Sequence, residues 1–162
     1  VIAAPLFPDA KVIFTAAASD FRPTKNRSEW CEHQNKKIYL DAYNANPSSM
    51  KIALEGFFDW LKHQGVTEDK TLVVLGDMNE LGDGAPAYHE QVGEFLRRWP
   101  ATTAVFIGRY APHYVTGLGR GDTFPEVLMF KGQSWNEMTQ GKTHVFIKGS
   151  RSLQLESLLA IT

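Results

Sequence analysis

The chain has almost no cysteine, because Cys31 is the single one among its 162 residues. One cysteine cannot form an internal disulfide, which excludes a small secreted domain held together by disulfides. Cys31 also lacks the paired spacing of zinc and redox motifs, and we interpret it as inert. A lone cysteine suits a reducing compartment, so the sequence predicts a cytoplasmic protein.

An excess of charge of either sign is also missing. The chain carries 17 Lys and Arg against 18 Asp and Glu, a formal net charge of -1. This balance gives no broad attraction to nucleic acid or anionic lipid, and we expect neither as a partner. Long apolar runs are missing too, since the apolar residues 1–18 are broken by Pro5, Pro8, Asp9 and Lys11. We therefore predict neither a signal peptide nor membrane insertion.

Several signature motifs of enzymes are absent. The stretch QGKTH (140–144) imitates the end of a P-loop, but Asn136 stands where the first glycine belongs and a strand-like run follows. The stretch GLGRGD (117–122) has Asp122 in place of the last glycine of a dinucleotide fingerprint. The five histidines show no metal-ligand spacing, so we expect no metal site in this chain. The pattern favours a surface or packing role for His89, which lies in a helix-like stretch.

The chain does contain a regular alternation of strand-like and helix-like segments. Short apolar runs predict strands at 37–43, 70–78, 102–108, 126–130 and 143–149. Helix-like segments lie at 47–65, 85–99, 111–118, 135–140 and 151–161, the first with an apolar stripe of Met50, Leu54, Phe57, Phe58 and Leu61. The alternation predicts an α/β fold with a Rossmann-like, mostly parallel sheet of about five or six strands and helices on both faces.

Polar side chains lie at or directly after the carboxyl ends of three of the expected strands. They are Asp41, Tyr43, Asn44 and Asn46 at the first strand, Asp77, Asn79 and Glu80 at the second, and Lys148, Ser150 and Arg151 at the last. Ligands of open α/β sheets bind outside the carboxyl ends of the strands. A carboxylate with amides beside a helix N-terminus suits ribose hydroxyls or a phosphate, and Lys148 with Arg151 suits an anionic group.

A structural interpretation accounts for part of the same pattern. Asn46 can cap a helix while Pro47 occupies its first position. Asp77 and Glu80 can also be capping residues, and KGSRS (148–152) can be a turn with solvated charges. The residues alone leave both interpretations open.

Four ordered motifs resemble the C-terminal domain of the Mur ligases. They are DAYNANPSSM (41–50) with NRS (26–28) upstream, VVLGDMNELG (73–82), HEQVGEF (89–95) and VFIKGSRS (145–152). The resemblance implies that residues 36–162 form this domain. It also implies that residues 1–35 are a linker and a remnant of the preceding central domain.

The resemblance implies an ATP-dependent amide ligase of peptidoglycan precursor synthesis. The stretches YNANP and KGSRS favour the members that add D-Ala-D-Ala to UDP-MurNAc-tripeptide through an acyl phosphate. In this family ATP and Mg²⁺ are bound mainly by the central domain, so the central and N-terminal domains are the expected partners. The chain by itself is then expected to be inactive.

The resemblance also implies roles for individual residues. The expected nucleotide-binding residues are Arg27, Asp41, Tyr43, Asn44 and Asn46, with Arg27 and Asp41 near the ribose or phosphate. The expected catalytic residues, toward the dipeptide and the reacting phosphate, are Lys148, Ser150 and Arg151. The alternatives are another Mur or folylpolyglutamate-type ligase, or a stand-alone nucleotide-binding module.

Overall fold

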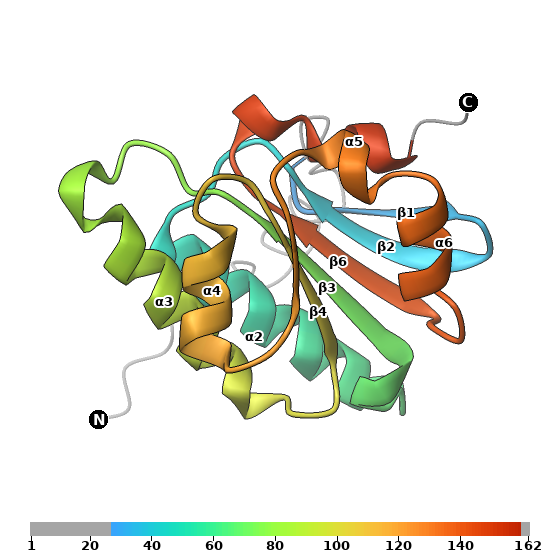
Figure 1. The fold of residues 1–162 in the computed structure, drawn as a ribbon. Coiled ribbons are helices and arrows are strands. Elements are labelled where there is room, and N and C mark those ends of the chain that lie inside the picture. The colour runs from blue at the N-terminus through green and yellow to red at the C-terminus, as the bar shows by residue number, and fades with distance from the viewer. Residues whose placement is uncertain (1–26, 160–162) are drawn as a thin grey trace, which may run out of the picture.

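The structure, a computed structural model, describes residues 27–159 of the chain. These residues form a six-stranded sheet in the order β1-β2-β6-β3-β4-β5 (Figure 1). The strands are β1 (Glu29–His33), β2 (Lys36–Asp41), β3 (Thr71–Gly76), β4 (Thr103–Ile107), β5 (Asp122–Phe124) and β6 (His144–Lys148). Strand β1 runs antiparallel to β2, and all other neighbouring strands are parallel. The expected mostly parallel α/β sheet is confirmed.

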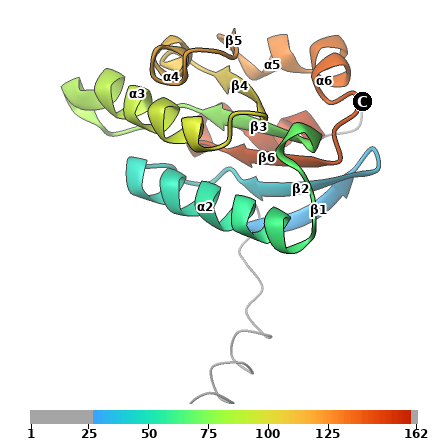
Figure 2. The same cartoon turned by 90° about the horizontal axis from the view of Figure 1, so that it is seen from below.

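Helices cover both faces of the sheet (Figure 2). One face carries α2 (Pro47–His63), α3 (Ala85–Phe95) and α4 (Ala111–Leu118), and the other carries α5 (Val127–Phe130) and α6 (Gln133–Met138). Short 3₁₀ helices are η1 (Glu68–Lys70), η2 (Gly82–Gly84), η3 (Leu96–Arg98), η4 (Arg151–Leu153) and η5 (Leu155–Leu159).

The sheet separates two apolar cores. Every residue of β3 and β6 is buried, as expected of central parallel strands that are covered on both faces. The predicted apolar stripe of α2 faces one core, and all five of its side chains are buried there. On the other face, Val127, Phe130 and Trp135 pack against the sheet from α5 and α6.

Helices α3 and α4 pack unusually close together through two glycines. A Cβ atom on Gly93 would stand 2.2 Å from the carbonyl oxygen of Tyr114, and one on Gly117 would stand 2.0 Å from that of Glu90. No other residue type leaves room for this approach. The close contact seats the buried Tyr114 so that its hydroxyl donates a 2.9 Å hydrogen bond to the carbonyl of Gly76, at the end of β3.

Two expected elements in the C-terminal third are wrong. Of residues 126–130, predicted as a strand, residues 127–130 form the single turn of α5, in which Val127 and Phe130 are buried while Leu128 and Met129 are exposed. Periodicity cannot separate a strand from a helix over so short an apolar run. Of the helix predicted at 151–161, residues 160 and 161 lie outside the described part, and the rest forms the pair η4 and η5, since Gln154 between them has a left-handed φ of 51°.

The sequence analysis did not anticipate β1. This strand lies at the edge of the sheet with alternating partial exposure, so it lacks the continuous apolar run of a central strand. Gln34 and Asn35 join it to β2 with φ values of 48° and 60°, as a tight hairpin turn requires. The sheet therefore includes residues on the N-terminal side of Lys36, where a linker was expected, whereas residues 1–26 lie outside the described part.

Candidate functional site

The polar strand ends meet at one edge of the sheet. Strand β6 lies between β2 and β3 and runs parallel to both, so the carboxyl ends of all three strands are neighbours. Asp41, the last residue of β2, pairs in register with Lys148, the last residue of β6. The segments after these strands therefore form the candidate site, at the edge where α/β sheets bind ligands.

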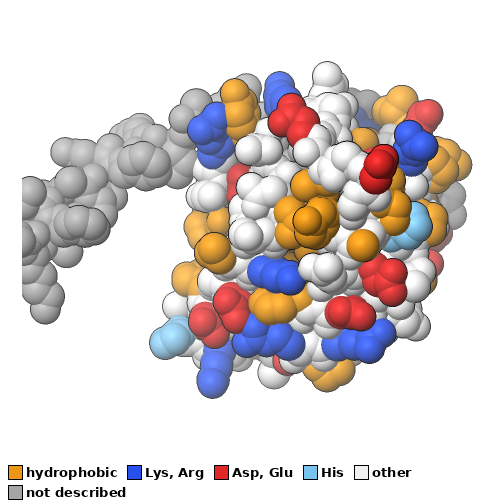
Figure 3. Space-filling model, turned by 90° about the vertical axis from the view of Figure 1, so that its left-hand side faces the viewer, with side chains coloured by type: hydrophobic (Ala, Val, Ile, Leu, Met, Phe, Trp, Pro, Cys, Tyr) orange, Lys and Arg blue, Asp and Glu red, His pale blue; other side chains and the backbone are white. Residues whose placement is uncertain are grey.

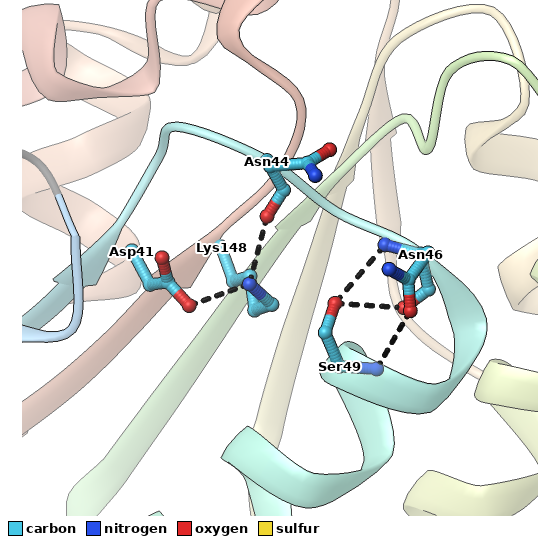
Figure 4. A network of polar contacts seen from close by, with 5 residues as sticks. All are labelled: Asp41, Asn44, Asn46, Ser49 and Lys148. Atoms are coloured by element: carbon cyan, nitrogen blue, oxygen red, sulfur yellow. Dashed lines mark hydrogen bonds and ion pairs between the residues drawn. The ribbon is translucent and has the colours of Figure 1, made fainter.

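Lys148 and Asp41 are each other's partners (Figure 4). The Lys148 ammonium lies 2.5 Å from the Asp41 carboxylate and donates a second hydrogen bond, 2.9 Å long, to the carbonyl of Asn44. Only 2% of the Lys148 side chain and 14% of the Asp41 side chain are exposed. A buried ammonium needs this compensation. Lys148 therefore ties the loop after β2 to β6, and its charge is turned into the protein.

Three other expected nucleotide-binding side chains are exposed at this edge. The Arg27 guanidinium carbon lies 3.7 Å from the centre of the Tyr43 ring, a cation–π contact. Tyr43 is 43% exposed, and Asn44 is exposed as well. In Figure 4 the Asn44 amide points away from Lys148, since the backbone carbonyl makes that contact. These groups are accessible to a ligand.

Asn46 caps helix α2. Its side-chain oxygen accepts the Ser49 N–H at 2.9 Å, and the Ser49 hydroxyl is 3.1 Å from the Asn46 N–H, a reciprocal capping box (Figure 4). Pro47 follows at the first helical position. The structural interpretation therefore accounts for the Asn46 oxygen, while Asn46 as a whole is exposed at the surface of the site.

Ser150 is held by the segment after β3. Its N–H donates to the carbonyl of Asp77, and its hydroxyl oxygen accepts the Asn79 N–H, both at 2.9 Å. The Asn79 side-chain amide also donates to the Ser152 hydroxyl at 2.8 Å. Ser150 is 3% exposed, so the segments after β3 and β6 are joined beneath the surface.

Arg151 lies beside Ser150 but faces outward. It forms an ion pair with Glu156 of η5, and about half of its side chain is exposed. The Glu156 side chain is 22% exposed, so the carboxylate of the pair is partly buried while the arginine reaches the surface. Arg151 is thus the one expected catalytic cation that the described structure leaves near the surface, in contrast to Lys148.

Two hollows flank the loop after β2. One, of about 510 Å³, lies between β1, β2 and α2, and its walls combine Asp41 and Ser28 with the aromatic rings of Trp30, Tyr39 and Trp60. The other, of about 440 Å³, lies between the start of α2 and the segment that contains Glu80 and Leu81. The loop thus stands between concave surfaces that combine polar and apolar groups.

Three further properties of the described residues concern metal ligands, surface charge and helix length. Within residues 27–159, no three His, Cys, Asp or Glu side chains gather where they could hold a metal ion. The face drawn in Figure 3 mixes basic and acidic side chains and has no patch of a single sign. None of the described helices has the length and apolar character needed to cross a membrane.

Asp77 and His89 also contact this edge of the sheet, although the sequence analysis gave neither of them a binding or catalytic role. The Asp77 carboxylate accepts the N–H groups of Arg109 and Tyr110 at 2.8 and 2.9 Å, which fixes the segment after β4. Gly108 permits this, because a Cβ there would lie 2.4 Å from the Asp77 carboxyl carbon. The position of Asp77 after a strand was visible in the sequence, but its partners are distant in the chain.

Comparison with protein families matches the chain to a family described as "Mur ligase, glutamate ligase domain", over residues 26–151. A relative from Rickettsia prowazekii, UDP-N-acetylmuramoyl-tripeptide--D-alanyl-D-alanine ligase, is 29% identical over 87% of this chain and 30% of its own length. A relative of the same name from Escherichia coli is 27% identical over 78% of this chain and 26% of its own length. The chain therefore spans less than a third of these relatives.

Solved structures show the same fold. MurF from Acinetobacter baumannii superimposes with a TM-score of 0.69 at 22% identity, covering 91% of this chain and 34% of that one. MurF ligase from Thermotoga maritima in complex with ADP gives a TM-score of 0.68 at 20% identity, covering 92% and 34%. The family match extends over most of the chain and includes the segments after β2, β3 and β6. The chain belongs to the Mur ligase family and carries its glutamate ligase domain.

Proposed function

We propose that this chain is the C-terminal domain of an ATP-dependent ligase that joins D-Ala-D-Ala to UDP-MurNAc-tripeptide in peptidoglycan precursor synthesis. The observation that carries the proposal is the family match together with relatives that bear this ligase name. The polar edge at the carboxyl ends of β2, β3 and β6 supports it, because it offers charged and amide groups where such sheets bind ligands.

The proposed reaction has two steps. The γ-phosphoryl group of ATP passes to the terminal carboxylate of the tripeptide, which gives an acyl phosphate and ADP. The amine of D-Ala-D-Ala then attacks the acyl carbon, expels inorganic phosphate, loses a proton and forms the amide. Negative charge shifts among the phosphoryl oxygens in both steps, so positioned cations and N–H groups stabilise the transition states.

In this proposal the exposed side chains contact the nucleotide, and the buried side chains hold the exposed ones in position. Arg27 and Tyr43 contact the ribose or a phosphate of ATP, with the Asn44 and Asn46 amides beside them. Asp41 and Lys148 act mainly through their ion pair, which holds the loop in place. Asp41, at the wall of the 510 Å³ hollow, keeps a partly exposed carboxylate for a ribose hydroxyl.

Ser150 and Arg151 lie toward the dipeptide and the acyl phosphate in the same proposal. Arg151 turns from Glu156 toward an anionic ligand in this proposal, because about half of its side chain is exposed. Mg²⁺ is required by the chemistry, but the described residues provide no ligand set for it. We therefore assign Mg²⁺, and most ATP contacts, to a central domain of the same enzyme.

The proposal also extends to domain organisation. We propose that residues 1–26 connect this domain to a central domain, which follows an N-terminal domain, and that the enzyme acts in the cytoplasm, where ATP is available. The chain covers 30% of the Rickettsia relative, which leaves room for both domains. The 162-residue chain alone is then expected to be inactive.

The decisive experiment measures phosphate release by the longer polypeptide that contains this chain. The polypeptide is given Mg-ATP and UDP-MurNAc-tripeptide, with and without D-Ala-D-Ala, and the 162-residue chain serves as the control. Release that requires the dipeptide supports the proposal. Phosphate release that requires another amino acid would mean that the enzyme is a different ligase of the same family. ATP binding without any turnover would favour a nucleotide-binding module.

A further inference from the structure

His89 on α3 occupies a position that the proposed chemistry does not use. Its ring is fully buried, and both of its nitrogens have backbone partners. Nδ1 lies 2.6 Å from the carbonyl oxygen of Ala85, and Nε2 accepts the N–H of Met78 at 2.9 Å. A carbonyl only accepts and an amide only donates, so Nδ1 carries the proton and Nε2 carries the lone pair. The two partners specify one neutral tautomer.

The surroundings of His89 favour this neutral form. Tyr110 stacks on the ring with a centroid distance of 4.7 Å, and Tyr114 meets it edge-on at 4.9 Å. Burial, the largest cause, lowers the pKa of His89, and His113 on α4 acts in the same direction. The hydrogen bond to Ala85 and the charge of Asp77 oppose the shift in pKa without reversing it. Protonation of the ring would also place a hydrogen on Nε2, where it would face the N–H of Met78 with no acceptor between them.

The partner of His89 lies at the centre of the polar edge. Met78 stands between Asp77, whose carbonyl accepts the Ser150 N–H, and Asn79, whose N–H donates to the Ser150 hydroxyl oxygen. Both bonds require the peptide planes on either side of Met78 to keep their orientation. The hydrogen bond from the Met78 N–H to His89 anchors this segment to α3.

We propose that His89 is a positioning residue: as the acceptor for the Met78 amide, its Nε2 fixes residues 77–79 in the conformation that orients Ser150. The Ser150 hydroxyl accepts from Asn79 through its oxygen, so its hydrogen is directed elsewhere. His89 contacts no reacting group in this arrangement. The structural part of the inference is independent of the ligase activity, whereas its effect on turnover rests on the proposed function.

Two substitutions separate the two nitrogens of His89. In His89→Gln the side-chain oxygen reaches the place of Nε2 and keeps an acceptor for Met78. In His89→Asn the shorter amide occupies the place of Nδ1, keeps the bond to Ala85 and loses Met78. Amide hydrogen exchange is measured in the 162-residue chain at Met78, Asn79 and Ser150, with Val74 of β3 as the core reference.

We expect His89→Asn to accelerate exchange at Met78 and Asn79 by about tenfold more than at Val74, and His89→Gln to restore most of the protection. Equal acceleration at Val74 and Met78 would make His89 a packing residue and overturn the proposal. Identical behaviour of the two variants would overturn it as well.

A second measurement needs no substitution and therefore holds even if both variants fail to fold. Nitrogen chemical shifts of His89 distinguish a protonated from an unprotonated Nε2. The unprotonated Nε2 and protonated Nδ1 are expected at neutral pH and, because burial lowers the pKa, still at pH values somewhat below about 6.5. The opposite tautomer would refute the proposal.

The functional consequence is tested in the longer polypeptide. His89→Asn should lower kcat with little change in KM for ATP, and His89→Gln should recover kcat. An unchanged kcat in His89→Asn would mean that His89 has a structural role but no effect on turnover. Absence of ligase activity in the unmodified enzyme would reject the proposed function alone, because the exchange and tautomer measurements stand apart from it.

Discussion

The segments after β2 and after β3 leave the same edge of the sheet, but they use their polar residues differently. After β2, Tyr43 and Asn44 are exposed, and Lys148 holds the segment through its ion pair with Asp41 and its hydrogen bond to the Asn44 carbonyl. After β3, the Asp77 carboxylate and the backbone of residues 77–79 are bonded to neighbouring segments and to α3. The first segment can present groups to a ligand, whereas the second holds the edge together.

The largest expected effect on stability comes from removing the ion pair between Asp41 and Lys148. Lys148→Met leaves the Asp41 carboxylate without its partner, and we expect a loss of about 3 kcal/mol in the free energy of unfolding. Chemical denaturation measures this loss, with Lys62→Met in the exposed last turn of α2 as the control. The double variant with Asp41→Asn should lose less than the sum of the single variants. Strict additivity would mean that the two side chains do not interact.

Disrupting the Asp77 hydrogen bonds after β3 is expected to lower the free energy of unfolding somewhat less. Asp77→Asn replaces one acceptor oxygen by an NH₂ group that faces a backbone N–H, and we expect a loss of about 2 kcal/mol. The matched control is Asp83→Asn, an exposed residue of η2 that should change stability by less than about 0.5 kcal/mol. Equal stability of the two variants would contradict the structural role given to Asp77.

The cap of α2 should have an intermediate effect. Asn46→Ala removes the acceptor for the Ser49 N–H and should lower the free energy of unfolding by about 1 kcal/mol. Asn46→Asp keeps an acceptor oxygen, so its thermal unfolding temperature should be close to that of the unmodified chain. If Asn46→Asp preserves stability but weakens ATP use in the longer polypeptide, the amide nitrogen serves the ligand while the oxygen serves the helix.

The smallest effect on stability is expected at the exposed end of the first segment. Arg27→Ala removes an exposed cation–π contact with Tyr43, which contributes about 0.5 kcal/mol. In the longer polypeptide the same change should raise KM for ATP severalfold, while Arg97→Ala, an exposed arginine of η3, should not. An unchanged KM for ATP would remove Arg27 from the proposed nucleotide contacts.

Much of the fold was accessible from sequence because its signals are local. The buried runs of β3 and β6 and the stripe of α2 are properties of consecutive residues, and a period of apolar residues identifies each of them. The failures are also local in origin. A four-residue apolar run became α5, and the alternating edge strand β1 resembled a polar linker, since neither is long or apolar enough to show its period.

The sequence by itself determined the class of fold, the family resemblance and the gathering of polar residues after three strands. The tertiary structure alone decided which of these residues are used internally. Asp41 and Lys148 are 107 positions apart, yet parallel pairing of β2 and β6 makes them neighbours. The contact between His89 and Met78 likewise depends on how α3 lies over the end of β3. Burial turns such neighbours into partners, because a buried charge or amide is stable only when another group satisfies it.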